Sequence, residues 1–305
     1  MAEKQGRREK IHKDSPVNNF IDLTNKNNPD QQYMDLLTAI EDYGITEPNT
    51  RTSTDIITLW DKNVGMTFDM RDEFPLINMR AVWNKGWIGE LLWFLTGDEK
   101  VDFLHKHKIH YWDAWIDENN TAGPIYSQLV NWNNDRTLNQ LDRAIDIIKE
   151  DPSSRQNVMT LWNASQISEM SVPPCPCQLQ FKIVNEKLSA RLYIRSSDTI
   201  VGLPFDMPIW ATLTRMVAQI TGYEPGNFHI VFGDPHIYCT KDNLGALEIM
   251  KTRTPGVSKP VLELNPDIKD IYKFGFDDVK VKDYNPHAAI PLKPIVGKDG
   301  RSYSR

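Results

Sequence analysis

Hydrophobic residues recur at helical spacing in four parts of this chain. The segments 31–43, 86–96, 138–148 and 208–221 place apolar side chains three or four positions apart, as one buried face of a helix requires. The pair Asp151-Pro152 follows the third segment and is typical of a helix end. The pattern therefore predicts four helices, of which 86–96 and 208–221 are the most apolar.

Alternation of polar and apolar residues marks the strands. Between 178 and 184, glutamines and a lysine alternate with leucine, phenylalanine and isoleucine, as in a half-buried strand. The turn Asn185-Glu186 leads into a second strand over 187–195, so the two form a hairpin. Further strands are expected at 56–60, 64–68, 157–162 and 228–232, and between 260 and 283. The polar run 233–238 is expected to end the strand before it.

These elements follow one another without an internal repeat or a linker, which predicts one α+β domain. The first 30 residues are polar, so we expect 1–30 to be a loosely ordered extension and 31–305 to form the domain. With 305 residues, 40% of them hydrophobic, the chain can bury a large core.

Charge and cysteine content narrow the class of protein. A net charge of −6 disfavours a general nucleic-acid binder, because attraction to phosphates needs a basic surface. No apolar run approaches the roughly 20 residues that cross a bilayer, and the charged N-terminus lacks the apolar core of a secretory signal. Three cysteines are an odd count, which disfavours a disulfide framework. We therefore expect a cytoplasmic protein that binds neither membranes nor nucleic acid.

Cys175 is the first candidate for chemistry. It stands between two prolines, which restrict the backbone and can hold the thiol at a fixed angle. A nearby cation such as Arg195 would raise its thiolate fraction at neutral pH. Cys175 and Cys177 could also form half of a metal site, but only Cys239 could add a third sulfur, so a metal is disfavoured. An inert buried cysteine is the remaining alternative.

Other titratable residues stand in informative surroundings. Glu90 is the one acid in the apolar segment 86–96; burial would raise its pKa and make it a proton donor or relay, and a place at the helix rim is the alternative. Arg51 lies in a loop rich in hydroxyl groups, which suits either phosphate binding or simple solvation. The histidines within 105–110 match no common zinc spacing, so we interpret them as structural or surface residues.

Ten short blocks match, in order, the motifs of the thymidylate synthase family. They are RTSTD at 51–55, GELLWFLTGD at 89–98, YWDAWIDE at 111–118, GPIY at 123–126, DPSSR at 151–155, PPC at 173–175, LYIRSSD at 192–198, GLPFD at 202–206, GDPHIY at 233–238 and YNPH at 284–287. Over about residues 30–290 the chain therefore resembles this family. The resemblance implies a mixed β-sheet packed by helices and a homodimer formed sheet to sheet.

The resemblance also implies an activity. It is the folate-dependent transfer of a one-carbon unit to C5 of a pyrimidine nucleotide, with 5,10-methylenetetrahydrofolate as co-substrate and no metal. Cys175 would attack C6 of the base, while Glu90 and Tyr126 would move protons. Implied nucleotide contacts are Arg51, Arg195 and Ser196, with Arg155 from the second subunit, on the phosphate, and His236 and Tyr238 on the sugar. Implied folate contacts are Trp112, Asp198, Gly202 and Arg80.

The chain departs from the synthase pattern at informative positions. Asp206 stands where the synthases have asparagine, which is the pattern of the dCMP hydroxymethylases of bacteriophages. As electrons move into the attacked cytosine ring, N3 becomes protonated, and a carboxylate can then accept from both N3–H and N4–H. Facing uracil, the same carboxylate would meet O4 as one acceptor against another, which predicts a preference of about 10²–10⁴-fold for the cytosine nucleotide. Pro176 replaces a histidine that helps solvate O4, which also fits cytosine. Gln156 replaces a phosphate-binding arginine, Ile194 replaces a glutamine, and the tail has no clean equivalent of the closing C-terminal residue.

We therefore predict an enzyme that hydroxymethylates dCMP at C5. In one alternative, hydride instead of water captures the intermediate and the product is 5-methyl-dCMP. A dUMP enzyme and a CMP enzyme are further alternatives, as is a non-catalytic relative that only binds nucleotides and would not need the thiol. A phage or prophage origin is a hypothesis that follows from the branch, since such enzymes serve phages that modify their cytosines.

Overall fold

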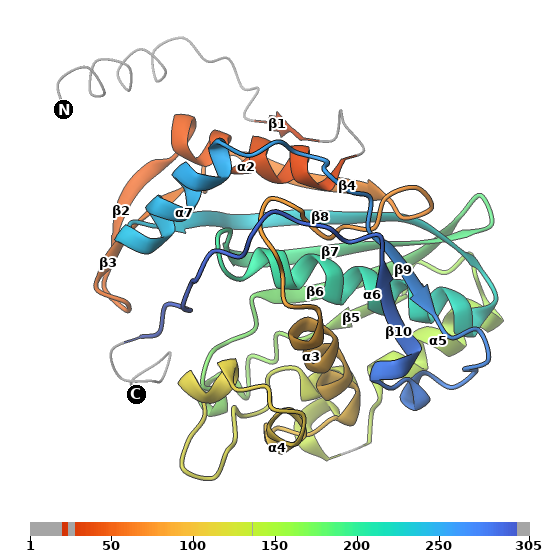
Figure 1. Ribbon diagram of the computed structural model, residues 1–305. Helices are drawn as coiled ribbons and strands as arrows, with labels where there is room; N and C mark the ends of the chain where they lie inside the picture. The colour runs from red at the N-terminus through yellow and green to blue at the C-terminus, as the bar shows by residue number, and fades with distance from the viewer. Residues whose placement is uncertain (1–19, 24–27, 136, 298–305) are drawn as a thin grey trace, which may run out of the picture.

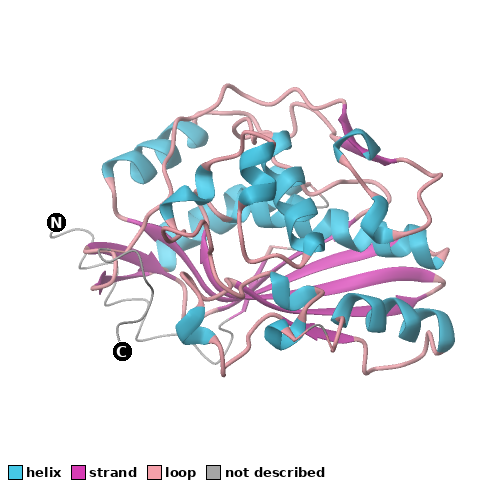
Figure 2. Cartoon of the chain, turned by 90° about the horizontal axis from the view of Figure 1, so that it is seen from below, coloured by secondary structure: helices cyan, strands magenta, loops and turns pink. Residues whose placement is uncertain are grey.

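The computed structural model describes residues 20–23, 28–135 and 137–297. The predicted loosely ordered extension, 1–30, lies largely outside this range. Within the described residues, no helix is both long and apolar enough to cross a membrane. The described chain forms one mixed sheet with helices packed against it, as Figures 1 and 2 show.

The sheet has the strand order β1-β4-β8-β7-β6-β5, and β2 and β3 join it through the pairing of β3 with β8. Its strands are β1 (Phe20–Asp22), β2 (Ile45–Asn49), β3 (Thr54–Thr58), β4 (Asn63–Asp69), β5 (Val158–Thr160), β6 (Pro176–Val184), β7 (Lys187–Asp198) and β8 (Glu224–Tyr238). The pairs β7–β8 and β1–β4 are parallel, and the other pairs are antiparallel, which makes the sheet mixed as predicted. A second, two-stranded sheet pairs β9 (Val261–Leu264) with β10 (Val279–Lys282).

Most of the helices lie on one side of the main sheet (Figure 2). The α-helices are α2 (Pro29–Tyr43), α3 (Asn84–Thr96), α4 (Asp102–Lys106), α5 (Gln140–Glu150), α6 (Leu203–Thr221) and α7 (Lys241–Lys251). The 3₁₀ turns are η1 (Tyr111–Ala114), η2 (Ser127–Leu129), η3 (Trp132–Asn134), η4 (Ile167–Glu169), η5 (Ile271–Lys273) and η6 (Phe276–Asp278). The four predicted helices and the central hairpin are confirmed.

Several predicted boundaries differ from the structure, and the start of α6 and the end of β8 matter most for the site. Helix α6 begins at Leu203, not at Pro208. Pro204 occupies the second helical position, where no backbone N–H is needed, and Pro208, inside the helix, removes only one backbone hydrogen bond. Strand β8 does not end at Phe232. It continues through the polar run to Tyr238, because its second half pairs with β3 and with the end of β7.

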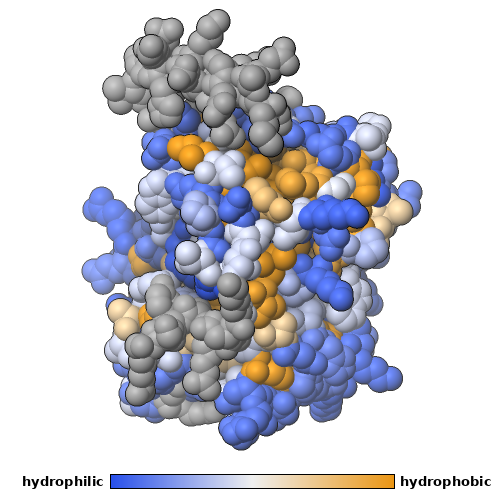
Figure 3. Space-filling view, turned by 90° about the vertical axis from the view of Figure 1, so that its left-hand side faces the viewer, coloured by the Kyte–Doolittle hydropathy of each residue, from blue (hydrophilic) through white to orange (hydrophobic). Residues whose placement is uncertain are grey.

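One face of the sheet is buried and the other is open. On β8, Phe228, Ile230 and Phe232 are buried under the helices, as the period-two pattern requires. On the opposite face, Tyr193 pairs across from Val231, and both are exposed. Figure 3, which shows the left-hand side of the view in Figure 1, has apolar surface between hydrophilic areas as well. The association of two open sheet faces stays a prediction.

Candidate active site

The loop that carries Cys175 is held by an arginine on the neighbouring strand. Arg195 of β7 donates through Nε to the carbonyl of Pro174 (3.0 Å) and through Nη2 to the carbonyl of Pro173 (2.8 Å). Its backbone N–H donates to the carbonyl of Cys175 (2.9 Å). The guanidinium also lies 5.2 Å from the ring centroid of Trp162, within the range of a cation–π contact. Arg195 therefore fixes the backbone on which the thiol is mounted.

The Cys175 thiol is not pre-ionised. Burial raises its pKa to about 11, the guanidinium of Arg195 lowers it, and the carboxyl of Asp206 raises it. Arg195 therefore lowers the Cys175 pKa, as expected, but burial raises it by more. The thiol is therefore protonated at neutral pH, and it would have to lose this proton to act as a nucleophile.

Glu90 is buried on the inner side of α3, with only 7% of its surface exposed, so the alternative of a rim position is wrong. The hydroxyl of Tyr111 donates to Oε2, and the indole N–H of Trp112 donates to Oε1 at 3.1 Å. Burial raises the Glu90 pKa to about 7, although both hydrogen bonds lower it. A carboxyl group with this pKa can take up and release a proton near neutrality.

Asp206 lies in the first turn of α6, where its backbone N–H donates to the carbonyl of Gly202 (3.1 Å). Among the described residues, no group is hydrogen-bonded to its half-buried carboxyl group. Burial raises the Asp206 pKa well above its usual range, and the carboxyl groups of Glu90 and Asp198 raise it further. These effects favour the protonated acid, which can donate as well as accept a hydrogen bond.

Tyr126 connects these groups. Its ring stacks on Phe94 with centroids 4.0 Å apart and planes inclined by 23°. Burial raises the pKa of its phenol well above the usual value, and the negative charges of Asp206, Cys175 and Glu90 raise it further. Tyr126 is therefore a neutral phenol that lies within the electrostatic reach of all three groups.

The residues expected at the sugar and phosphate come from β8 and the loop before β3. Arg51 donates through Nη2 to the hydroxyl of Tyr238 (3.2 Å). His236 Nδ1 lies 3.1 Å from the carbonyl of Asp234, so this nitrogen carries a hydrogen and donates it to that carbonyl. Nε2 is buried and has no partner among the described residues. A ligand hydroxyl would satisfy it.

Ser196 and Arg155 complete the expected phosphate set. Ser196 is half-buried on β7 and pairs in register with Asp234 of β8. Arg155 is exposed on the loop that precedes β5. Its contact with the site of a second subunit stays a prediction.

Of the four residues expected at the folate, Asp198 and Gly202 flank the short segment between β7 and α6, Arg80 is hydrogen-bonded to that segment, and Trp112 lies apart on η1, where it donates to Glu90. Asp198 accepts from the backbone N–H groups of Ile200 and Val201, both at 3.1 Å, and burial raises its pKa. Gly202 caps the N-terminus of α6. Arg80 is buried and donates through Nη2 to the carbonyl of Ile200 (2.9 Å), while its Nε has no partner among the described residues. Arg80 therefore braces the segment that carries the other two.

Three aromatic residues that the sequence reasoning missed form a cradle beside Glu90. Tyr111 lies edge-to-face with Trp83 (centroids 6.4 Å apart) and with Phe205 (5.5 Å). A Cβ at Gly86 would lie 2.7 Å from Trp83 and 3.2 Å from Phe205, so the cradle needs a glycine there. Trp83 is 47% exposed, and a large exposed aromatic residue just before an apolar helix was the available signal. Such a surface fits the flat rings of a folate.

The site thus combines a buried thiol, carboxyl groups with raised pKa values and a set of aromatic rings. The sequence model of one protein family, described as thymidylate synthase, matches residues 31–296. The chain belongs to the thymidylate synthase family, and the resemblance in its ten motifs is confirmed at that level. It is therefore a one-carbon transferase that acts at C5 of a pyrimidine nucleotide and uses methylenetetrahydrofolate as co-substrate.

Proposed function

We propose that this enzyme hydroxymethylates dCMP at C5, with Cys175 as the nucleophile at C6. The observation that carries the proposal is Asp206. Its carboxyl group stands where the synthases present a carboxamide, has no partner among the described residues, and has a pKa raised by burial. Such a group suits a base that offers one nitrogen acceptor and one amine donor.

The chemistry of cytosine matches a neutral Asp206. The acid O–H donates to N3, and the carbonyl oxygen accepts from N4–H. As the Cys175 thiol gives its proton to the Glu90 carboxylate through water and the sulfur bonds to C6, the electrons of the C5–C6 double bond move into the ring and N3 takes the proton from Asp206. The carboxylate left behind accepts from N3–H and N4–H in a bidentate, charge-assisted pair. In uracil, N3 already carries a hydrogen, and an ionised Asp206 would face O4 as acceptor against acceptor.

The remaining residues handle protons and position the substrates. Glu90, with a pKa of about 7, removes and returns protons through water, and the neutral Tyr126 assists removal of the C5 proton. Because Glu90 can activate a water molecule at neutral pH, we favour water over hydride as the final reactant. Bound 5,10-methylenetetrahydrofolate supplies the one-carbon unit. Trp112, Asp198, Gly202 and Arg80, together with the aromatic cradle, would hold it.

On the nucleotide side, Arg51, Arg195 and Ser196 would bind the phosphate, and Arg155 of a second subunit would complete the set. The unpartnered Nε2 of His236 would accept a hydrogen bond from the sugar 3′-hydroxyl. This division of roles requires a homodimer, whose interface we propose to be the open face of the sheet.

The test compares kcat/KM for dCMP and dUMP in the wild type and in Asp206→Asn. We expect the wild type to prefer dCMP by about 10²–10⁴-fold and the variant to lose or invert this preference. Asp242→Asn is the matched control, because Asp242 also lies in the first turn of a helix, α7, but is exposed and is not among the residues assigned to the site. A wild type that prefers dUMP, or an Asn variant that keeps the dCMP preference, would contradict the proposal.

A further inference from the structure

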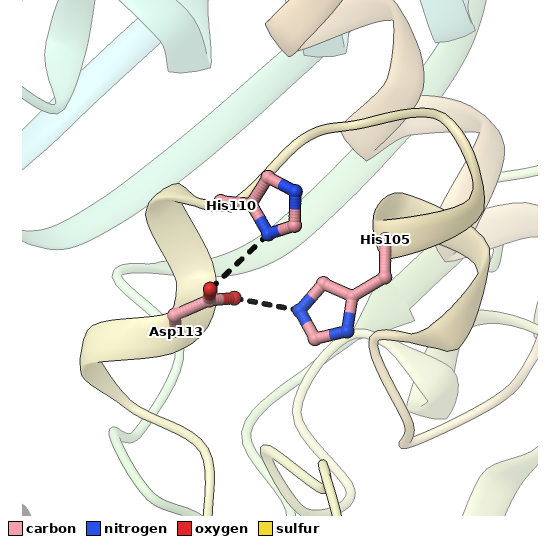
Figure 4. A group of neighbouring side chains, drawn as sticks. All are labelled: His105, His110 and Asp113. Atoms are coloured by element: carbon pink, nitrogen blue, oxygen red, sulfur yellow. Dashed lines mark hydrogen bonds and ion pairs between the residues drawn. The ribbon is translucent and has the colours of Figure 1, made fainter.

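Two of the three clustered histidines are brought together by an aspartate. His105 Nε2 lies 2.6 Å from Oδ1 of Asp113, and His110 Nδ1 lies 3.2 Å from Oδ2 of the same carboxylate. Figure 4 shows both rings pointing toward Asp113 from separate parts of the chain. His107 turns away and packs against Phe276, with centroids 4.6 Å apart. The spacing in sequence gave no indication of this arrangement, because α4 and η1 bring the residues together.

The three ligand atoms lie almost as close together as the ligands of a bound metal ion. One ligand atom from each residue lies within 4.8 Å of the other two. Nitrogen and oxygen ligands at about 2.0–2.2 Å from a tetrahedral zinc ion lie roughly 3.3 Å from one another, so modest side-chain rotations would bring all three into place. Two imidazoles and one carboxylate suit zinc and similar transition ions better than Mg²⁺ or Ca²⁺.

We propose that His105, His110 and Asp113 bind a divalent transition ion of the zinc type, with water in the remaining position. All three side chains are at least partly exposed, so an ion can enter from solvent and keep a water ligand. The site is separate from the Cys175 centre and uses none of the residues assigned to catalysis. It goes beyond the one-carbon transfer and does not depend on it.

The position of the site gives the ion a structural effect. Asp113 belongs to η1, the same short turn that carries Tyr111 and Trp112, whose side chains donate to Glu90. His105 belongs to α4, so a bound ion joins α4 to η1 by coordination bonds. The ion therefore stabilises the turn that presents both donors to Glu90, and these residues act as positioning residues.

The first test is a Co²⁺ titration of the full chain followed by visible absorption. We expect one bound ion per chain, with the d–d bands of nitrogen and oxygen ligation, displaced by Zn²⁺ but not by Mg²⁺. His110→Ala and Asp113→Asn should each weaken binding at least as much as the roughly 10–100-fold lost when an outer-shell partner is removed. His107→Ala is the matched control and should bind like the wild type.

The cysteines provide the main competing site for such an ion. Binding through Cys175, Cys177 or Cys239 would give a thiolate-to-metal charge-transfer band in the near ultraviolet, and this result would overturn the proposal. Equal binding by the wild type and Asp113→Asn would overturn it as well, as would no binding at all.

Hydrogen exchange gives a second readout that needs no turnover. Zn²⁺ should slow amide exchange in the peptide that spans residues 105–115 in the wild type and leave it unchanged in Asp113→Asn. If exchange slows equally in both proteins, the ion lies elsewhere and the proposal fails. Because neither measurement uses a nucleotide or a folate, the proposed dCMP activity could fail while the metal site holds, and the reverse.

Discussion

The substitution Glu90→Gln should change how the stability of the protein depends on pH. The buried Glu90 carboxyl has a pKa of about 7, against an ordinary value of 4.5. The folded state therefore retains this proton over a pH range in which the unfolded chain has already lost it. As the pH rises through that range, the wild type loses stability relative to a variant that cannot ionise.

The size of the effect follows from the shift. A rise from 4.5 to about 7 at 1.36 kcal/mol per unit corresponds to about 3 kcal/mol. The penalty is absent below pH 4.5, grows between 4.5 and 7, and is complete above 7. Asp206 acts in the same direction, because the Glu90 charge raises its pKa and that influence disappears in the variant. From pH 5 to pH 8, the free energy of unfolding of Glu90→Gln should therefore rise by about 3 kcal/mol relative to that of the wild type.

The assay is urea unfolding of both proteins across pH 5–8, at one fixed protein concentration so that any association of subunits affects both equally. The variant also loses the hydrogen bonds of the carboxylate, which changes the difference in unfolding free energy between the two proteins by the same amount at every pH. The pH dependence of that difference therefore reports the Glu90 ionisation. Tyr111→Phe is the companion variant. Because this variant lacks the donor to Glu90, its Glu90 pKa should be higher, and its loss of stability should extend to higher pH than in the wild type. A difference in unfolding free energy between the wild type and Glu90→Gln that stays constant over pH 5–8 would contradict a raised pKa for Glu90.

Three further predictions concern the site. Arg195→Gln should slow alkylation of Cys175 at fixed pH, because the lost cation raises the thiol pKa; an unchanged rate in an iodoacetamide assay would contradict this. Gly86→Ala places a Cβ 2.7 Å from Trp83, and an overpacking cost of about 1–3 kcal/mol should raise KM for the folate about tenfold while KM for dCMP stays the same. Cys175→Ser and Arg155→Ala should each be inactive, and mixing them after mild dissociation should restore activity. Without such recovery, Arg155 does not act across the interface.

Elements with a strong local pattern could be predicted from the sequence. The hairpin of β6 and β7 was predicted because its residues alternate without interruption between two faces. Helix α7 was missed although Thr240 caps it, accepting from the N–H of Asn243 (3.1 Å), and Ala246, Leu247 and Met250 form its buried stripe. Strand β2 gave no signal, because it is a largely exposed edge strand that contains a proline.

The site was less accessible than the fold because tertiary structure decides its chemistry. The sequence indicated that Glu90 would have a raised pKa if it were buried, and the apolar helix around it made burial a reasonable hypothesis. It could not show that burial would outweigh Arg195 at Cys175, since this depends on the surroundings of both side chains. Nor could it place Asp206 inside α6, because Pro208 looked like a helix start.

The proposed function requires that Asp206 selects cytosine and that water completes the reaction. Mass spectrometry of the nucleotides, after incubation of the enzyme with equal dCMP and dUMP and methylenetetrahydrofolate, tests both requirements at once. We predict a gain of about 30 mass units on dCMP, with tetrahydrofolate as co-product and dUMP unchanged. A gain of about 14 on dCMP with dihydrofolate would contradict water capture, and product formed from dUMP alone would contradict the role of Asp206.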